Sequence, residues 1–286
     1  MTSSTITSAA DAVAQLVTNC PFCGKKLLTV VGEFVALDPT DKRYIATIGL
    51  KRACDCPTAK RAQAEQKAAE EAKEREKKAK AERAAAATRM LEAGMPEKWL
   101  SERGLAKWSQ DQPCREEAYE RAVAFGMALA TRTLPRSLYI AGDVGVGKTF
   151  LASSLCTDLI RRGHRVLWRN VSDVLREIRS CFDDRKTKET EVIARFVRPR
   201  VLVLDDLGKE RPTEWALEQL FSVVNSRYDA GLPLIVTTNY GSADLVRRLT
   251  PRADAAGYAD DTTARAIVDR LRGTAQLIKL EGKSRR

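Results

Sequence analysis

A glycine-rich segment, GDVGVGKT, fits the phosphate-loop pattern G-x-x-x-x-G-K-[ST]. It follows a strand-like run, SLYIAG, and precedes a helical pattern. Glycines there let backbone N–H groups close around a phosphate, and the start of the helix adds the positive end of its dipole. In this pattern the lysine reaches the β- and γ-phosphates, and the final hydroxyl ligates Mg²⁺. We therefore predict an ATP site whose loop consists of Gly142, Asp143, Val144, Gly145, Val146, Gly147, Lys148 and Thr149.

Two more polar clusters each follow a buried-strand pattern. The run VLVLDDLG places Asp205 and Asp206 at the C-terminal end of a strand, where α/β sheets bind ligands. We assign Asp205 to the hydrated Mg²⁺ and Asp206 to the attacking water, although an apolar run that ends in two aspartates is often only a strand end. The run LIVTTN adds Asn239, whose amide would either hold the water against the γ-phosphate or open a turn before Gly241.

Four of the seven cysteines form two close pairs, CPFC and CDC. Four thiolates are a complete tetrahedral ligand set for a structural Zn²⁺. The second pair has one spacer residue instead of two, so two unrelated pairs of reduced thiols are the alternative. The N-terminal residues show no secretory signal pattern, and we therefore expect reduced, cytoplasmic cysteines. The predicted zinc ligands are Cys20, Cys23, Cys54 and Cys56.

The elements that would position these residues alternate between strands and helices from about residue 96 onward. Strand-like runs cover 137–142, 164–170, 200–207, 232–239 and 275–282, and helix-length segments such as 149–162, 172–182 and 214–230 lie between them. Such alternation predicts an α/β fold in which a parallel sheet is covered by helices.

Composition divides the chain into three zones. Residues 1–57 hold the cysteine pairs and two β-like runs, 26–37 and 43–50, that predict a hairpin with its turn at DPTDK. Residues 58–95 are rich in Ala, Lys, Glu and Arg. This zone lacks the large apolar residues of a coiled coil, so it is predicted to be a solvated helical linker. Residues 96–286 form the predicted nucleotide-binding domain.

Composition also excludes several functions. The 286 residues include 49 Lys and Arg against 38 Asp and Glu, and the net charge of +11 indicates a polyanionic partner without identifying one. The one histidine, His164, lies in a basic turn before a strand and is interpreted as a surface residue, so chemistry that relies on histidine bases is excluded. No apolar run approaches the roughly 18 residues of a membrane helix.

The motifs GDVGVGKT, VLVLDDLG and VTTN, preceded by MLEAGMPEKWL, together resemble the AAA+ ATPases of the DnaC/DnaI helicase-loader group. IstB-type transposition ATPases are also similar, and the resemblance covers about residues 90–286. It implies a three-layer P-loop domain with Asn239 as the sensor 1 residue. It also implies that Arg270 is an arginine finger offered to the ATP of a neighbouring subunit, and that Arg286, or Arg285 beside it, is a terminal sensor 2 residue.

This sequence departs from the AAA+ pattern in two places. The second acid after the buried strand is Asp206, where most AAA+ proteins have a longer Glu, and we therefore predict slow, oligomer- or DNA-dependent turnover. We also expect no full helical lid domain after Gly273, so that assembly would depend on a partner or on DNA.

Basic residues are frequent between residues 170 and 200. In the resembled group, helices at this point line a channel for single-stranded DNA, which implies Arg176 and Arg179 as nucleic-acid contacts. The aromatic residues of this segment are Phe182 and Phe196, so phosphate contact is expected to dominate over base stacking. A solvated helix face is the alternative.

The resemblance implies an ATP-dependent loader of a replicative hexameric helicase in DNA replication, with ATP, Mg²⁺ and Zn²⁺ as cofactors. Its implied partners are the helicase, single-stranded DNA and further copies of the chain, in the cytoplasm of a bacterial or phage-infected cell. Residues 1–57 have six basic and five acidic side chains, which favours protein docking over DNA binding for this zone. The alternatives are an IstB-like transposition helper, and a zinc-containing nucleic-acid-binding adaptor with a regulatory ATP site.

Overall fold

The computed structural model describes residues 17–28, 30–35, 45–50, 56–131, 133, 137–183, 189–210, 213–252 and 260–285. The chain divides into two compact units, Met1–Lys80 and Ala81–Arg286. None of the helices in the described ranges combines the length and apolar character that a membrane crossing needs.

The first unit contains two short antiparallel strand pairs. Strand β1 (Val17–Asn19) pairs with β2 (Lys26–Leu28), and the cysteine pair of CPFC begins in the turn that joins them. Strand β3 (Val30–Val35) pairs with β4 (Ile45–Leu50). The second pair confirms the predicted association of the two β-like runs, whereas the DPTDK segment lies outside the described residues.

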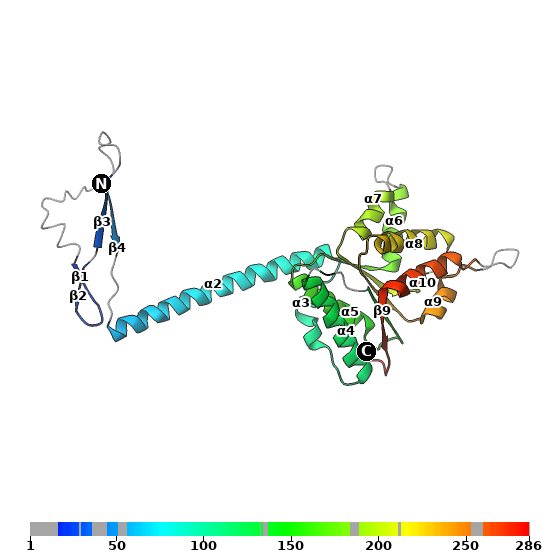
Figure 1. Ribbon diagram of the computed structural model, residues 1–286, viewed down its shortest axis with the longest axis horizontal. Coiled ribbons are helices and arrows are strands. Elements are labelled where there is room, and N and C mark those ends of the chain that lie inside the picture. The colour runs from blue at the N-terminus through cyan, green and yellow to red at the C-terminus, as the bar shows by residue number, and fades with distance from the viewer. Residues whose placement is uncertain are drawn as a thin grey trace. The chain divides into compact units, whose positions relative to one another are not determined.

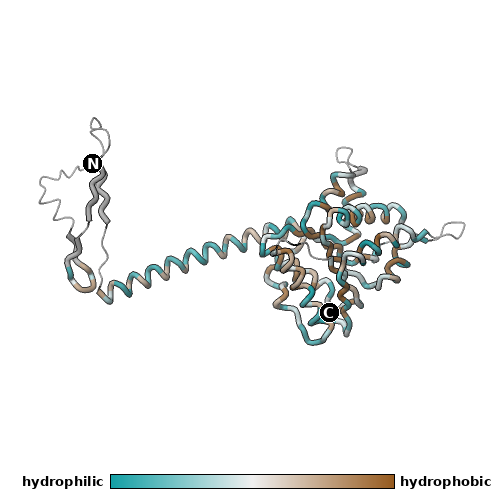
Figure 2. Tube along the Cα trace, viewed as in Figure 1, coloured by the Kyte–Doolittle hydropathy of each residue, from teal (hydrophilic) through white to brown (hydrophobic). Residues whose placement is uncertain are grey.

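Helix α2 (Pro57–Glu92) follows, and Figure 1 draws it as one uninterrupted helix. Every residue from 63 to 85 is exposed, and Figure 2 shows the helix as mainly hydrophilic. Ion pairs one turn apart, such as Lys67 with Glu71, lie along this solvated stretch. The helix ends at Glu92, and the positive φ of 75° at Gly94 allows the amide of Met95 to donate to the carbonyl of Met90.

The second unit is built on a five-stranded parallel sheet with the order β6-β7-β8-β5-β9. This arrangement confirms the predicted α/β fold. The strands are β5 (Ser137–Gly142), β6 (Val166–Asn170), β7 (Val201–Leu207), β8 (Leu234–Thr238) and β9 (Ala275–Leu280), each within a predicted run.

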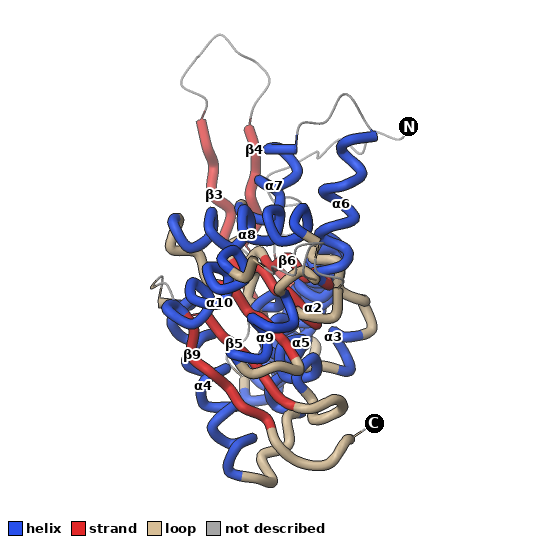
Figure 3. Tube along the Cα trace, turned by 90° about the vertical axis from the view of Figure 1, so that its right-hand side faces the viewer, coloured by secondary structure: helices blue, strands red, loops and turns tan. Residues whose placement is uncertain are grey.

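Helices cover both faces of this sheet, and Figure 3 shows strands between helices. Side chains that alternate along a strand enter opposite cores: Leu138 joins the core with α4 and α5, and Tyr139 joins the core with α6 to α10. One face carries α3 (Trp99–Glu102), α4 (Pro113–Ala130) and α5 (Lys148–Arg161), with a 3-10 turn, η1 (Leu105–Lys107). The other carries α6 (Val171–Asp183), α7 (Glu189–Val197), α8 (Glu214–Asp229), α9 (Ser242–Leu249) and α10 (Thr262–Thr274).

Arg227 of α8 is a fully buried charge in the second core. Its guanidinium donates hydrogen bonds to five backbone carbonyls, at 2.7–3.3 Å. Burial lowers the pKa of this guanidinium to about 10. The accepting residues are Phe196, Val197, Pro199, Arg200 and Pro233. Arg227 therefore fastens the end of α7 and the starts of β7 and β8 to α8.

Contacts from the preceding segment and from α4 reach the outer strands of the sheet. On β6, the amide of Trp168 donates to the carbonyl of Ala93 at 2.8 Å. On β9, the guanidinium of Arg121 from α4 donates to the carbonyl of Leu277. Both edge strands thus have backbone groups bonded to segments outside the sheet.

Candidate functional site

The phosphate loop lies where β5 ends and α5 begins, as its sequence predicts. Gly142, Gly145 and Gly147 all have positive φ, which a side chain would oppose. The nearly buried Lys148 points its Nζ back over the loop and donates to the carbonyls of Gly142 and Asp143 at 2.8 Å each. A lysine held here beside a ring of backbone amides fits a triphosphate.

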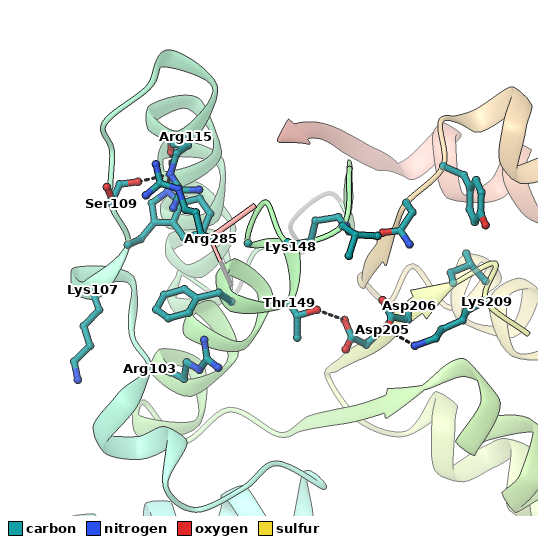
Figure 4. A pocket seen from close by; sticks show the side chains of 18 of the residues that line it. Arg103, Lys107, Ser109, Arg115, Lys148, Thr149, Asp205, Asp206, Lys209 and Arg285 are labelled. Atoms are coloured by element: carbon teal, nitrogen blue, oxygen red, sulfur yellow. Dashed lines mark hydrogen bonds and ion pairs between the residues drawn. The ribbon is translucent and has the colours of Figure 1, made fainter. Parts of the chain in front are cut away.

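Asp205 forms a hydrogen-bonded cluster with two hydroxyl groups, and Figure 4 shows the bond from Thr149. Its Oδ1 accepts from Thr149 Oγ1 at 3.1 Å and from Thr237 Oγ1 at 2.6 Å. Burial of the carboxyl raises the pKa of Asp205, the charge of Asp206 raises it further, and the two hydroxyls oppose these effects. Oxygen donors of this kind fit Mg²⁺, whose charge would stabilise the carboxylate. The pairing of Thr149 with Asp205 is the one that the motifs predict.

Asp206 has an unusual backbone. It is the one non-glycine residue with positive φ, 59°, among the residues that the structure describes. The register of β7 against β8 shifts between Leu204 and Leu207, and the amide of Asp206 donates to Thr237 Oγ1 at 2.9 Å. Bulges of this kind redirect a side chain beside an active site. Asp205 is therefore buried, whereas Asp206 is partly exposed and pairs with Lys209 at 3.4 Å.

The loop and the two aspartates line one cavity of about 930 Å³. Asn239, at the end of β8, lines it too, so the structure brings these predicted residues together. Much of the opposite wall comes from residues around η1, α4 and the start of α5 that carry no recognisable motif (Figure 4). These additional lining residues include Arg103, Lys107, Trp108, Ser109, Arg115 and Phe150.

Arg115 holds the phosphate loop by a hydrogen bond to its backbone. It is nearly buried, its guanidinium carbon lies 3.8 Å from the centre of the Trp108 ring, and it donates to the carbonyl of Val146 at 3.1 Å. Burial lowers the pKa of Arg115, and the charge of Arg285 lowers it further. Sequence reasoning missed Trp108 and Arg115 because neither belongs to a pattern of fixed spacing.

The end of the described chain crosses the phosphate loop. The amide of Arg285 donates to the carbonyl of Gly145 at 3.0 Å, and its guanidinium pairs with Asp111 and lines the cavity. A Cβ on Gly145 would lie 2.1 Å from Ser284 Oγ, so a glycine is needed for this approach. Arg286, the other candidate for the terminal arginine, lies outside the described residues.

Arg270 is absent from the lining of this cavity. On α10 its Nε donates to Asn225 Oδ1 at 2.6 Å, and its guanidinium carbon lies 4.7 Å from the centre of the Phe221 ring. The structure therefore places Arg270 away from the nucleotide cavity of its own chain.

The predicted nucleic-acid contacts lie on α6. Arg176 is exposed and pairs with Asp173 at 2.9 Å, while Arg179 stacks on Trp215 with its guanidinium carbon 4.6 Å from the ring centre. The fully buried Phe196 has no face for a base, and the side chain of Phe182 lies outside the described residues. Trp215, on a separate helix, was not predicted.

Three of the four predicted zinc ligands converge in the first unit. The Sγ atoms of Cys20, Cys23 and Cys56 all lie within 4.8 Å of one another, with 3.9 Å between those of Cys20 and Cys56. A tetrahedral Zn²⁺ with Zn–S bonds near 2.3 Å holds its sulfurs about 3.8 Å apart. The thiol set therefore fits zinc, while Cys54 lies outside the described residues.

Comparison with known proteins places this site in a family. The model of the IstB-like ATP binding protein family matches residues 49–286. The replicative helicase loader DnaI of Bacillus subtilis (strain 168) is 26% identical over 152 residues, 53% of this chain and 48% of DnaI. The ATP-binding protein inferred for insertion sequence IS5376 of Geobacillus stearothermophilus is 27% identical over 209 residues, 69% of this chain and 78% of that protein.

A solved structure has a similar fold. The crystal structure of DnaI matches with a TM-score of 0.54 and 26% identity, over 67% of this chain and 94% of that chain. In sequence, the chain spans about half the length of the loader. The phosphate loop, the Thr149–Asp205 pair and the matched AAA+ fold are those of an ATPase that uses ATP and Mg²⁺. The chain therefore belongs to the family of IstB-like ATP-binding proteins.

Proposed function

We propose that this chain is an ATP-dependent loader of a replicative DNA helicase. The observation that carries the proposal is the division of its chemistry between two compact units: the nucleotide cavity lies in Ala81–Arg286, and the cysteine cluster lies in Met1–Lys80. A loader needs one surface that responds to ATP and another that holds the helicase. DnaI, a replicative helicase loader, is among the relatives of the chain.

Each predicted residue of the nucleotide cavity has a role in this proposal. Lys148 leaves the two loop carbonyls to bind the β- and γ-phosphates, and Thr149 and Asp205 hold Mg²⁺, which neutralises phosphate charge when bound. Asp206, turned outward by the bulge, orients the attacking water, and Asn239 holds that water from the neighbouring strand. Because the side chain of Asp206 is short, we expect it to hold the water less well and turnover to be slow.

Arg270 acts on a neighbouring subunit in this proposal. Its distance from its own cavity supports a role in trans, so hydrolysis requires a homo-oligomer assembled on ATP or DNA. Arg285, which already lines the cavity, and Arg286 beside it are the candidates for the terminal sensor that contacts the nucleotide. A monomer that hydrolyses ATP as fast as the assembled protein would refute the role of Arg270.

Single-stranded DNA binds along α6 through Arg176 and Arg179. Both side chains line a groove of about 410 Å³ with Trp215. Cationic side chains beside an aromatic ring suit a flexible strand, since they hold phosphates and offer a face for a base. Zn²⁺ bound by Cys20, Cys23, Cys54 and Cys56 stabilises the small unit that docks on the helicase.

A second function, helping a transposase, is favoured by the family match and by the coverage of the insertion-sequence relative. The experiment that separates the two uses the full chain with ATP, a purified hexameric replicative helicase, and single-stranded or duplex DNA of equal length. A loader captures the helicase and hydrolyses ATP faster with single strands. Lys148→Ala is the control that loses hydrolysis.

Capture of the helicase only by protein with intact cysteines would support docking through the zinc unit. Preference for duplex DNA together with a failure to capture the helicase would refute the loader and favour the transposition helper. ATP binding without phosphate release under every condition would instead favour a nucleic-acid-binding adaptor with a regulatory ATP site.

A further inference from the structure

A second basic groove lies beside the edge strand β6, away from both sites described above. Its volume is about 430 Å³, and none of its lining residues also lines the nucleotide cavity or the groove beside Trp215. The wall draws on the end of α2, the turn before β6, β6 itself, α6, and α7 with the two residues that follow it. The basic residues that line it are Arg89, His164, Arg165, Arg169, Arg195 and Arg198.

The groove has more positive charge than its own acids neutralise. Two glutamates line it, Glu92 and Glu177. Glu177 pairs with Arg169, which also bonds the carbonyl of Trp168. Four arginines of the lining then remain against the single carboxylate of Glu92, so this surface attracts anions.

Three of these arginines are available to a ligand. Arg165, Arg195 and Arg198 are exposed, and none forms an ion pair with an acidic side chain in the described part of the chain. Arg195 and Arg198 are three residues apart at the end of α7 and therefore lie on one side of it. Arg165 approaches from a different element, so the three converge from two walls.

The walls are fixed before any ligand arrives. The amide of Trp168 on β6 bonds the carbonyl of Ala93 at 2.8 Å, which holds the end of α2 against the strand. The end of α7 is fastened by the five-carbonyl contact of Arg227. A preformed groove loses less conformational freedom on binding than a mobile one.

The one histidine of the chain is a reporter inside this groove. Burial lowers the pKa of His164, and the positive charges of Arg200 and Arg162 lower it further. The imidazole is therefore neutral near pH 7 in the absence of an anion. A bound phosphate group would supply the missing negative charge and raise the pKa again.

We propose that this groove binds the phosphate backbone of single-stranded DNA through Arg165, Arg195 and Arg198. The inference rests on the proposed DNA-binding function and extends the path of the strand beyond α6. Arg176 and Arg179 line the groove on one flank of α6, and Glu177 lines the groove on the other. A positively charged groove that follows the backbone is typical of proteins that hold a single strand, and a duplex is the alternative that the test distinguishes.

The test compares two matched double variants of the full chain. Arg195→Gln with Arg198→Gln removes two cations from the groove, and Lys73→Gln with Lys77→Gln removes two from the exposed face of α2. Binding of oligo(dT) of about 25 nucleotides is followed by fluorescence anisotropy over a range of salt concentrations. We expect the groove variant to lose about tenfold in affinity at low salt, and its log–log salt slope to fall by about 1.4, since each single-strand phosphate contact contributes about 0.7. The α2 variant should change less than twofold.

The histidine provides a second readout that a merely structural role would not move. In an NMR titration of the imidazole signal, oligo(dT) should raise the pKa of His164 in the unmodified chain. A duplex of the same length should produce a smaller rise.

The outcomes separate the two proposals. Failure of the unmodified chain to bind oligo(dT) refutes the proposed DNA-binding function itself. Normal binding by the unmodified chain, with the same affinity and salt slope in the groove variant, overturns only the groove. An unmoved His164 signal at saturating oligo(dT), or tighter groove-dependent binding of the duplex, also overturns it.

Discussion

Replacing Arg227 with methionine tests how the second core is held together. Methionine fills a similar volume but donates no hydrogen bond. Three of the five carbonyls that Arg227 serves, those of Phe196, Pro199 and Pro233, are bonded within the buried interior, and the other two are only partly buried. Water reaches the latter more easily, so the main loss comes from the three buried carbonyls.

The expected loss of stability follows from two opposing effects. A buried carbonyl without a donor costs about 2 kcal/mol, so three cost about 6 kcal/mol. The substitution also removes a desolvated charge, and the lowering of the Arg227 pKa from 12.5 to about 10 corresponds to a burial cost of about 3 kcal/mol. The free energy of unfolding should therefore fall by about 3 kcal/mol, which lowers Tm by about 6–12 °C in a unit of this size.

Tryptophan fluorescence during urea unfolding measures this loss in the right unit, because all four tryptophans lie between residues 99 and 215. Arg265→Met is the matched control. That arginine is exposed and pairs with Asp261 at the surface, so its loss should change stability by no more than about 0.5 kcal/mol. A loss below about 1 kcal/mol for Arg227→Met would show that the carbonyls find other donors and that the contact does not hold α7 in place.

Three further predictions address the site and the cysteine cluster. Asp205→Asn keeps the oxygen that accepts from both threonines and removes a carboxyl whose pKa is raised on folding. The unmodified chain should therefore lose stability as pH rises from about 4 toward neutrality, and urea unfolding should show that the variant does not. ATP hydrolysis by the variant should fall at least about 100-fold. Asp206→Gly should abolish hydrolysis without loss of stability, whereas Asp206→Val should cost more than about 1 kcal/mol because its φ is 59°; equal stabilities would refute backbone strain. A zinc chelator should alter the far-ultraviolet circular dichroism of the cysteine unit and leave tryptophan fluorescence unchanged; a coupled fluorescence change would contradict separate units.

The parallel sheet, and the polar residues at the C-terminal ends of its strands, could be predicted because each depends on local sequence. The four residues from Val201 to Leu204 are all fully buried, and this two-sided burial makes an interior parallel strand an unbroken apolar run. The phosphate loop and the polar residue at the end of each strand have fixed spacing. Lys148, Thr149, Asp205 and Asn239 accordingly reach one cavity as predicted.

Residues that act through tertiary contact could not be predicted in the same way. Trp108 and Arg115 reach the loop because η1 and α4 pack against α5, and no spacing in the sequence reports that packing. Trp215 meets Arg179 across two helices. The sequence around His164 predicts a surface residue in a basic turn and does not reveal the groove, since other residues that line it, such as Arg195, are distant in sequence.

The two bonded edges of the sheet bear on how the protein avoids aggregation. An open edge strand is a template for pairing with another chain. Here the amide of Trp168 on β6 donates a hydrogen bond to the carbonyl of Ala93, and Arg121 donates one to the carbonyl of Leu277 on β9. Ala93, which bonds β6, comes before every strand of the parallel sheet in the sequence. A chain shortened to begin at residue 96 would keep every residue of the nucleotide site yet expose β6, and light scattering should then detect self-association that the longer chain does not show.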